Sequence, residues 1–244
     1  MGPRIIATTV ALGVMVTVAV AGISHAVGSA ESGPQTSTGW VRTITNPYLP
    51  YTPGSRWVYK GMKDGVTQTD VVEATHRTRV IAGVRTTIVR DVATHNGRIL
   101  EATTDYYAQD ASGNVWYFGE ATKAFGPGGQ VDTSGSWLAG VNGARQGIFM
   151  TAHPAVEDAH RQEFAPGNAE DQYWLVALHH GVSVPAVTSN RAALTIEWSR
   201  LEPTVIDEKS YVPGIGPVRE IAVQGPAEDA NLVKFTHSAG SQAG

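Results

Sequence analysis

The residues that decide the fold are Thr104-Asp105-Tyr106-Tyr107-Ala108-Gln109-Asp110-Ala111-Ser112-Gly113-Asn114-Val115-Trp116-Tyr117-Phe118-Gly119-Glu120. Tyrosine, tryptophan, phenylalanine and valine dominate both ends of this stretch, and such side chains suit a pleated, half-buried surface. The middle, from Asp110 to Gly113, favours a type I turn, because aspartate bonds the backbone ahead of it and glycine tolerates the last turn position. The stretch therefore predicts two antiparallel strands joined by a tight turn.

The upstream arm, which begins near Arg98, has two chemically different faces. Side chains alternate across a strand, so one face holds Ile99, Glu101, Thr103, Asp105 and Tyr107, and the drier face holds Leu100, Ala102, Thr104, Tyr106 and Ala108. The first face carries two carboxylates beside an aromatic ring. It is either an acidic, solvated face with a tyrosine lying over it or the wall of a ligand cavity whose polar groups are these carboxylates.

The downstream arm is aromatic on both faces. Trp116, Phe118 and Glu120 alternate there with Val115 and Tyr117. A strand with large rings on both faces is typical of a sandwich or barrel, where it lies between two packed layers.

Further strands are predicted at regular intervals on both sides of this hairpin. Their expected ranges are 56–62, 66–75, 84–95, 192–201, 205–212, 218–223 and 231–236. Asn96-Gly97 is a strong hairpin turn before the Arg98 arm. The fold class is mainly β: a single antiparallel domain, either a barrel or a strongly curved sheet or sandwich, with at most one or two short helices. No strand-helix-strand unit or nucleotide-binding glycine motif is present.

Three segments leave alternatives open. Residues 125–143 form a glycine-rich insertion in which Trp137 either closes a pocket or pins the loop to the surface. Residues 147–167 form either a short helix opened by Pro154 or a kinked strand, and a helix would place His160 and Glu163 on one face. Such a pair lacks the further ligands of a zinc site, so no metal site and no cofactor are predicted. Residues 172–180 form either a helix or a strand.

The N-terminal part of the sequence predicts an exported protein. Residues 1–30 read as a signal peptide or an uncleaved N-terminal anchor, because one basic residue, Arg4, precedes an uncharged apolar run. Residues 31–45 are expected to be a flexible tether, 46–237 the antiparallel β domain, and 238–244 a loose tail. The expected location is therefore secreted or extracytoplasmic, in the cell envelope, with membrane contact only through an uncleaved N-terminal segment.

Composition excludes several classes of function. The 244 residues include no cysteine, which excludes disulfides, thiolate metal sites and a cysteine nucleophile. The formal net charge is −4 and the basic residues are dispersed, so nucleic acid is not an expected partner. Oligomeric state is left open.

Three segments also resemble a group of exported bacterial proteins of unassigned function. They are Gly113-Asn114-Val115-Trp116-Tyr117-Phe118-Gly119-Glu120, the Leu201-Glu202-Pro203 corner with Lys209, and Tyr211-Val212-Pro213-Gly214-Ile215-Gly216-Pro217-Val218-Arg219-Glu220. The resemblance implies one exported, mainly antiparallel β domain and carries over no catalytic residue.

Three functions follow from these features. The first is binding of a small amphiphilic or apolar ligand, for which the candidate residues are Asp105, Tyr107, Trp116, Glu120, Glu197 and Trp198. Apolar rings would desolvate the ligand body, and Asp105 or Glu120 would orient its polar end. The second is an extracellular carboxylate-dependent enzyme, for which a general acid and a general base must share a cleft. The third is a structural or interaction module of the cell envelope.

Overall fold

The computed structural model describes residues 39–237. The apolar N-terminal run, residues 31–38 of the expected tether and the tail 238–244 lie outside the described residues. Within 39–237, no helix has the length and apolar character needed to cross a membrane.

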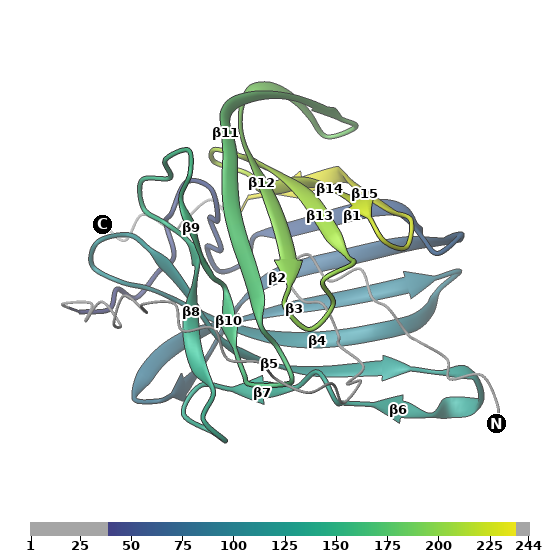
Figure 1. The fold of residues 1–244 in the computed structure, drawn as a ribbon, viewed down its shortest axis with the longest axis horizontal. Coiled ribbons are helices and arrows are strands. Elements are labelled where there is room, and N and C mark those ends of the chain that lie inside the picture. Colours follow the sequence, from purple (N-terminus) through teal and green to yellow (C-terminus); the bar gives the residue numbers. More distant parts are fainter. Residues whose placement is uncertain (1–38, 238–244) are drawn as a thin grey trace.

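The described chain is almost entirely β-structure, as predicted (Figure 1). The first half contains β1 (Arg56–Lys63), β2 (Val66–Ile81), β3 (Val84–His95), β4 (Arg98–Gln109), β5 (Val115–Phe125), β6 (Val131–Asp132), β7 (Trp137–Leu138) and β8 (Arg145–Met150). The second half contains β9 (Ala159–Arg161), β10 (Glu163–Phe164), β11 (Asp171–Val184), β12 (Val187–Ser199), β13 (Ile206–Val212), β14 (Gly216–Gln224) and β15 (Glu228–Thr236). The one helical turn among residues 39–237 is η1 (Pro127–Gly129).

The strands form one antiparallel sheet that curls into a nearly closed barrel (Figure 1). Its order is β10-β8-β5-β4-β3-β2-β1-β15-β14-β13-β12-β11-β9. The two end strands, β9 and β10, are separated in sequence only by Gln162, whose backbone NH donates to the Asp171 carbonyl at 2.9 Å. The chain thus leaves one edge of the sheet and joins the other within a single residue. At this seam Gly147 permits a close approach, because a Cβ there would overlap the carbonyls of Arg161 and Gln162.

Both helical alternatives are wrong. Residues 171–184 form β11, where Tyr173 and Leu175 are fully buried and Trp174 between them is exposed. This alternation has the period of a strand, and β11 gains backbone hydrogen bonds from β12 and β9 on its two sides. His160 and Glu163 lie on β9 and β10, in short strands rather than on one helix face.

The segment before β1 packs against the barrel. The Tyr51 ring lies 5.3 Å from Trp57 on β1 and 5.1 Å from Tyr107 on β4, measured between centroids. The side-chain oxygen of Gln109 accepts hydrogen bonds from the backbone of Thr45 and Asn46, at 2.7 and 2.8 Å. The segment therefore lines one end of the interior with an aromatic ring.

Candidate binding site in the barrel

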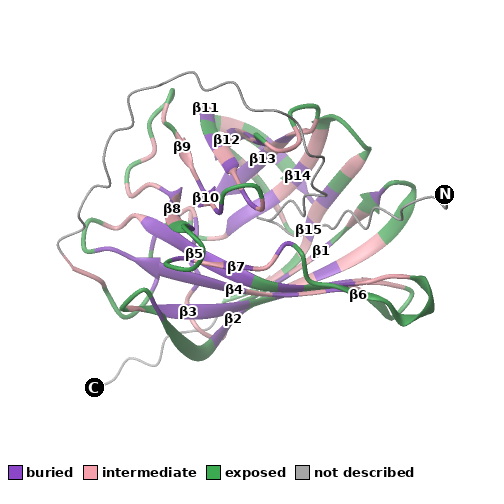
Figure 2. Cartoon of the chain, turned by 60° about the horizontal axis from the view of Figure 1, so that its bottom comes forward, coloured by how far each residue is buried: buried purple, intermediate pink, exposed green. Residues whose placement is uncertain are grey.

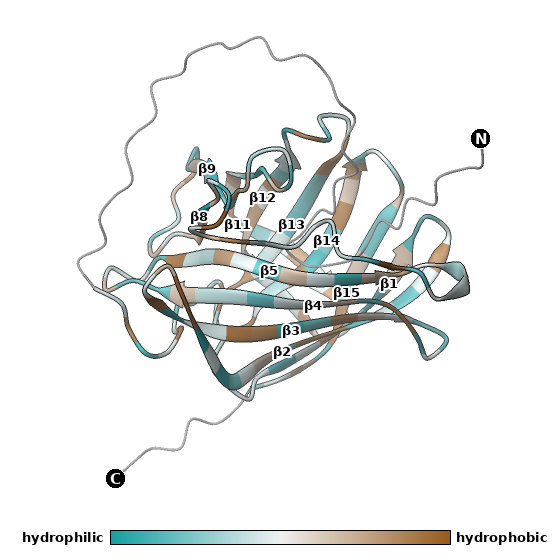
Figure 3. Ribbon diagram, turned by 90° about the horizontal axis from the view of Figure 1, so that it is seen from below, coloured by the Kyte–Doolittle hydropathy of each residue, from teal (hydrophilic) through white to brown (hydrophobic). Residues whose placement is uncertain are grey.

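Strand register turns the carboxylates of the central hairpin into the barrel. Asp105 lies opposite Glu120, and Tyr107 lies opposite Tyr117. Glu101, Asp105 and Glu120 are each no more than 5% exposed, and Figure 2 shows β4 and β5 buried along much of their length. The expectation of a solvated acidic face is therefore wrong. Hydrophilic segments occur along β4 (Figure 3), and its residues Glu101, Thr103 and Asp105 are buried.

One side of the interior, which we call the acidic wall, carries six buried carboxyl groups, and its strands contribute no buried basic side chain among residues 39–237. It is formed by β2 to β5 and β10. Its members are Asp70, Asp91, Glu101, Asp105, Glu120 and Glu163, all buried. The buried basic side chains among residues 39–237 are Lys63 and Lys209, and both belong to the opposite side.

The opposite side, which we call the paired wall, places each lysine against carboxylates. It is formed by β1 and β12 to β15. The Lys209 Nζ lies 3.1 Å from Glu197 and 3.4 Å from Glu220, and the Lys63 Nζ lies 2.7 Å from Glu228. Burial lowers the pKa of Lys209, but the charges of Glu197 and Glu220 outweigh it and raise that pKa above its ordinary value.

Asp105 lies at the centre of the acidic wall. Its Oδ1 accepts a hydrogen bond of 2.7 Å from the Tyr117 hydroxyl. Burial raises the pKa of Asp105 to about 7; the Tyr117 hydrogen bond opposes this shift, and the charges of Glu101 and Asp70 add to it.

Asp70 and Asp91 form a coupled pair on the neighbouring strands. Burial raises the pKa of Asp70 to about 6, and the neighbouring Asp91 carboxyl partly opposes the shift. Burial, then the charge of Asp70, raises the pKa of Asp91 as well. Two adjacent buried carboxyls cannot both ionise at low cost, so ionisation of one disfavours ionisation of the other.

Glu120 and Glu163 share with Asp70 a carboxyl group that no protein atom satisfies. Neither oxygen of either carboxyl has a hydrogen-bond partner, and both side chains are at most 1% exposed. Burial raises both pKa values; the next contributions are the charge of Glu163 for Glu120 and the charge of Asp171 for Glu163. Each carboxyl is thus a buried polar group with open hydrogen-bonding capacity.

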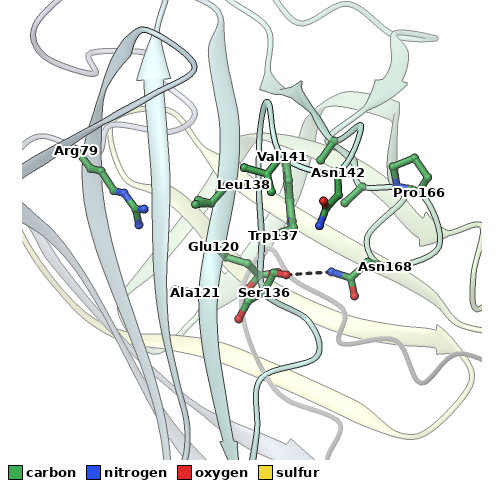
Figure 4. Close-up of a pocket in the computed structure, with 12 residues that line it drawn as sticks. Arg79, Glu120, Ala121, Ser136, Trp137, Leu138, Val141, Asn142, Pro166 and Asn168 are labelled. Carbon is green, nitrogen blue, oxygen red and sulfur yellow. Dashed lines mark hydrogen bonds between the residues drawn. The ribbon is translucent and has the colours of Figure 1, made fainter.

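A cavity of about 470 Å³ lies beside Glu120 (Figure 4). Trp137 on β7 lines it, pairs with Glu120 in the sheet, and lies edge-on to Tyr117 at 5.6 Å. The indole Nε1 of Trp137 has no hydrogen-bond partner. Gly119 allows β7 to lie this close, because a Cβ there would overlap the Trp137 carbonyl. Other lining residues include Ser136, Leu138, Val141, Ala165 and Asn168.

Four of the six predicted site residues face the interior, but Glu197 lies on the paired wall, and of the six only Glu120 lines the cavity. Asp105, Tyr107, Glu120 and Glu197 face the interior, as their register shows. Trp116 and Trp198 lie on the opposite faces of their strands, since Trp116 pairs with Ala108 and Trp198 follows the inward Glu197. The Trp116 Nε1 donates to Asp110 at 2.8 Å, and its ring meets Trp40 edge-on at 6.2 Å. Trp40 lies within the expected tether.

Sequence reasoning missed Asp70 and Asp91, left open whether Trp137 closes a pocket, and considered Glu163 beside His160 as an incomplete metal pair. A signal existed for Asp91, which interrupts the β-branched run 88–92 on the face shared with Val89 and Ala93. His160 stacks on Tyr173 at 4.5 Å, and burial lowers its pKa to about 4. Within residues 39–237, no three histidine, aspartate or glutamate side chains form a group that could hold a metal ion.

Comparison with known proteins yields a likeness of fold. No protein-family model matches the chain, and no curated protein sequence matches it significantly. Two solved structures are similar: a Bacteroides fragilis protein described as exported, with a YmcC-like fold, and a Parabacteroides distasonis protein described as a lipoprotein. The TM-scores are 0.45 and 0.46, each at 13% identity over 78% of this chain and 99% of the other.

Proposed function

We propose that this chain is an exported protein that binds a small amphiphilic ligand in the cavity beside Glu120. The observation that supports the proposal best is a cavity of about 470 Å³ whose lining combines apolar side chains with a few polar residues. Ligand sites in proteins are typically concave and mainly apolar, with a few polar groups that fix orientation. Polar lining residues such as Ser136 and Asn168 would hold the polar end of the ligand, and Trp137 and Leu138 would cover its body.

Native mass spectrometry of the protein recovered from its own host's exported fraction tests this proposal. We expect a mass above that of the polypeptide, which is lost on denaturation, and loss of this extra mass in Trp137→Ala. Leu201→Ala, which changes a half-buried residue outside the cavity lining, is the control. A bare polypeptide mass, obtained under conditions that preserve a known carrier–ligand complex, would contradict the proposal.

A carboxylate-dependent enzyme is the second candidate, favoured by the coupled pair Asp70 and Asp91. Two carboxyls that share a proton can act as general acid and general base. This candidate requires a substrate to reach the pair, so a turnover assay should show loss of activity in both Asp70→Asn and Asp91→Asn. Activity that survives both substitutions would exclude the pair as the acid and base.

A further inference from the structure

The β2–β3 hairpin beside the cavity has a basic end. Residues 74–90 contain no aspartate or glutamate, although the whole chain has a formal net charge of −4. Residues 76–80 of β2 are all exposed. The arginines of this stretch are Arg77, Arg79, Arg85 and Arg90. The hairpin therefore concentrates positive charge at one accessible place on a mildly acidic protein.

This basic end is packed against the cavity. Arg79 lines the cavity together with Leu138 and Val141. A Cβ placed on Gly140 would lie 3.6 Å from the Cβ of Ala82 at the hairpin tip, so the tip lies against the loop that follows β7. In Figure 4 the Arg79 side chain points from its own strand toward the side on which Leu138 and Val141 lie. One cationic side chain thus borders an apolar part of the lining.

Arg79 is held in place but keeps hydrogen-bonding capacity. Its Nη1 donates to the Tyr106 hydroxyl at 3.0 Å, and its guanidinium lies over the Tyr106 ring, 5.1 Å from the centroid. Within residues 39–237 it forms no ion pair with a carboxylate. A guanidinium has five N–H donors, so the remaining donors are available to a ligand, and the contact with Tyr106 reduces the entropy lost on binding.

The other side chains of the lining do not oppose an anion. Glu120 is the second charged residue type in the lining, but its carboxyl oxygens have almost no accessible surface. Burial raises the pKa of Glu120 well above its ordinary value, which favours the neutral carboxyl. Ser136 and Asn168 are uncharged and can hold an uncharged polar group of the ligand. Among the described residues that line the cavity, Arg79 therefore supplies the accessible charge.

We infer that the ligand is a small amphiphilic carboxylate, whose head group binds the Arg79 guanidinium while its apolar body lies against Leu138 and Val141. The inference rests on the proposed function and specifies the class of ligand. The planar guanidinium matches a carboxylate with two parallel hydrogen bonds. Val141 is 50% exposed, so apolar surface is available beside the charge. The neighbouring exposed arginines, Arg77 and Arg85, add a positive field that attracts an anion to this end of the barrel.

Three probes with the same eight-carbon chain test the class of head group: octanoate, 1-octanol and octylamine. Titration calorimetry of the full chain should show octanoate binding about tenfold more tightly than octanol, with octylamine weakest. Arg79→Gln should weaken octanoate binding about tenfold and leave octanol binding unchanged. Arg79→Lys should give an intermediate loss, because it keeps the charge and loses the paired donors.

Arg85→Gln is the matched control on the same hairpin. Arg85 is exposed and lies opposite Val80, whereas Arg79 lies opposite Thr86, so the two arginines are on different faces of the hairpin. Its replacement should change octanoate affinity less than about twofold. An equal loss in Arg79→Gln and Arg85→Gln would show a general charge effect in place of a head-group site and would overturn the inference.

A cavity-filling variant locates the apolar body. Ala121 is exposed and lines the cavity, so Ala121→Trp would occupy the space that the ligand needs. It should weaken octanoate and octanol binding alike, with an unchanged circular dichroism spectrum. Unchanged octanoate affinity in this variant would place binding elsewhere and would overturn the inference.

The outcomes separate the two proposals. Octanol or octylamine binding as tightly as octanoate, or Arg79→Gln leaving octanoate affinity unchanged, would overturn the carboxylate inference and leave the carrier function standing. A neutral or cationic ligand found by native mass spectrometry would have the same effect. Failure of octanoate to bind also overturns the inference, and the proposed function fails with it if the exported protein has the bare polypeptide mass.

Discussion

Both walls of the barrel bury carboxyl groups, but only the paired wall places buried lysines beside them. On the paired wall, Lys209 lies between Glu197 and Glu220, so buried carboxylates are neutralised within the protein. On the acidic wall, the buried carboxyls have one another as neighbours, and burial raises the pKa of Asp105 to about 7. The first arrangement neutralises buried charge within the protein, and the second makes the stability of the protein depend on pH.

The largest effect should come from removing the cation of the paired wall. Lys209→Met would leave Glu197 and Glu220 buried without a counter-charge, and breaking such a group typically costs about 3–5 kcal/mol. Urea unfolding at pH 8 measures this loss, with exposed Lys234→Met as the control. The loss should shrink as pH falls, because burial raises the pKa of Glu220 and Lys209 is the first-named charge that opposes this shift. A cost under about 1 kcal/mol would show that the two walls do not differ as described.

The second effect is a dependence of stability on pH that the acidic wall imposes. The pKa values of Asp105 and Asp70 are raised to about 7 and about 6, above the ordinary value of 3.8 in the unfolded chain. The folded state therefore binds more protons, and its stability falls as pH rises through these values. Between pH 6.5 and 8 we expect a decrease of roughly 1 kcal/mol in the free energy of unfolding.

His160 opposes the gain in stability that Asp105 and Asp70 provide as pH falls. Its pKa is lowered to about 4 by burial, so below pH 6.5 the unfolded chain binds the proton first and stability is lost as pH falls. His160→Phe should retain the stack on Tyr173 and extend the stability gain down to about pH 5. A flat stability profile from pH 6.5 to 8 in the unmodified protein would mean that the acidic wall is neutralised by another route.

Replacing one carboxyl on each wall should change the free energy of unfolding in opposite directions. Asp105→Asn keeps an acceptor for the Tyr117 hydroxyl and removes a buried charge, so it should stabilise the protein by about 1–2 kcal/mol at pH 8. Glu197→Gln, which weakens the ion pair with Lys209, should destabilise it. Thermal unfolding of both variants at pH 8 checks the pair. Destabilisation of similar size in both would remove the distinction between the walls.

The smallest effect should come from the outer face of the hairpin. Trp116→Phe loses the hydrogen bond to Asp110, which is worth about 1 kcal/mol. Because Trp116 faces away from the interior, ligand retention in the native mass spectrum should be unchanged, whereas Trp137→Phe should reduce it. Loss of ligand in Trp116→Phe, with the fold intact by circular dichroism, would show that Trp116 contributes to the binding site.

Local patterns predicted most strands because they depend on short-range alternation and turn chemistry. Strand β3 runs from Val84 to His95, as its residues and the Asn96-Gly97 turn predict. The failures occurred where the pattern fits two structures. Residues 172–180 have an acidic, cap-like beginning typical of a helix, but they form a strand because hydrogen bonds to β9 and β12 are available on both sides.

The sequence by itself determined the strands, the turns and the two unlike faces of β4, because alternation and turn preference act over a few residues. Only the tertiary structure decided which face is inside. Closure of the sheet at Gln162 makes one face of every strand an interior, and the register opposes Asp105 to Glu120 across β4 and β5. The tertiary structure also decided which buried charges are paired. Lys209 meets Glu197 and Glu220 from neighbouring strands, while no buried basic side chain of residues 39–237 lies on the strands of the acidic wall.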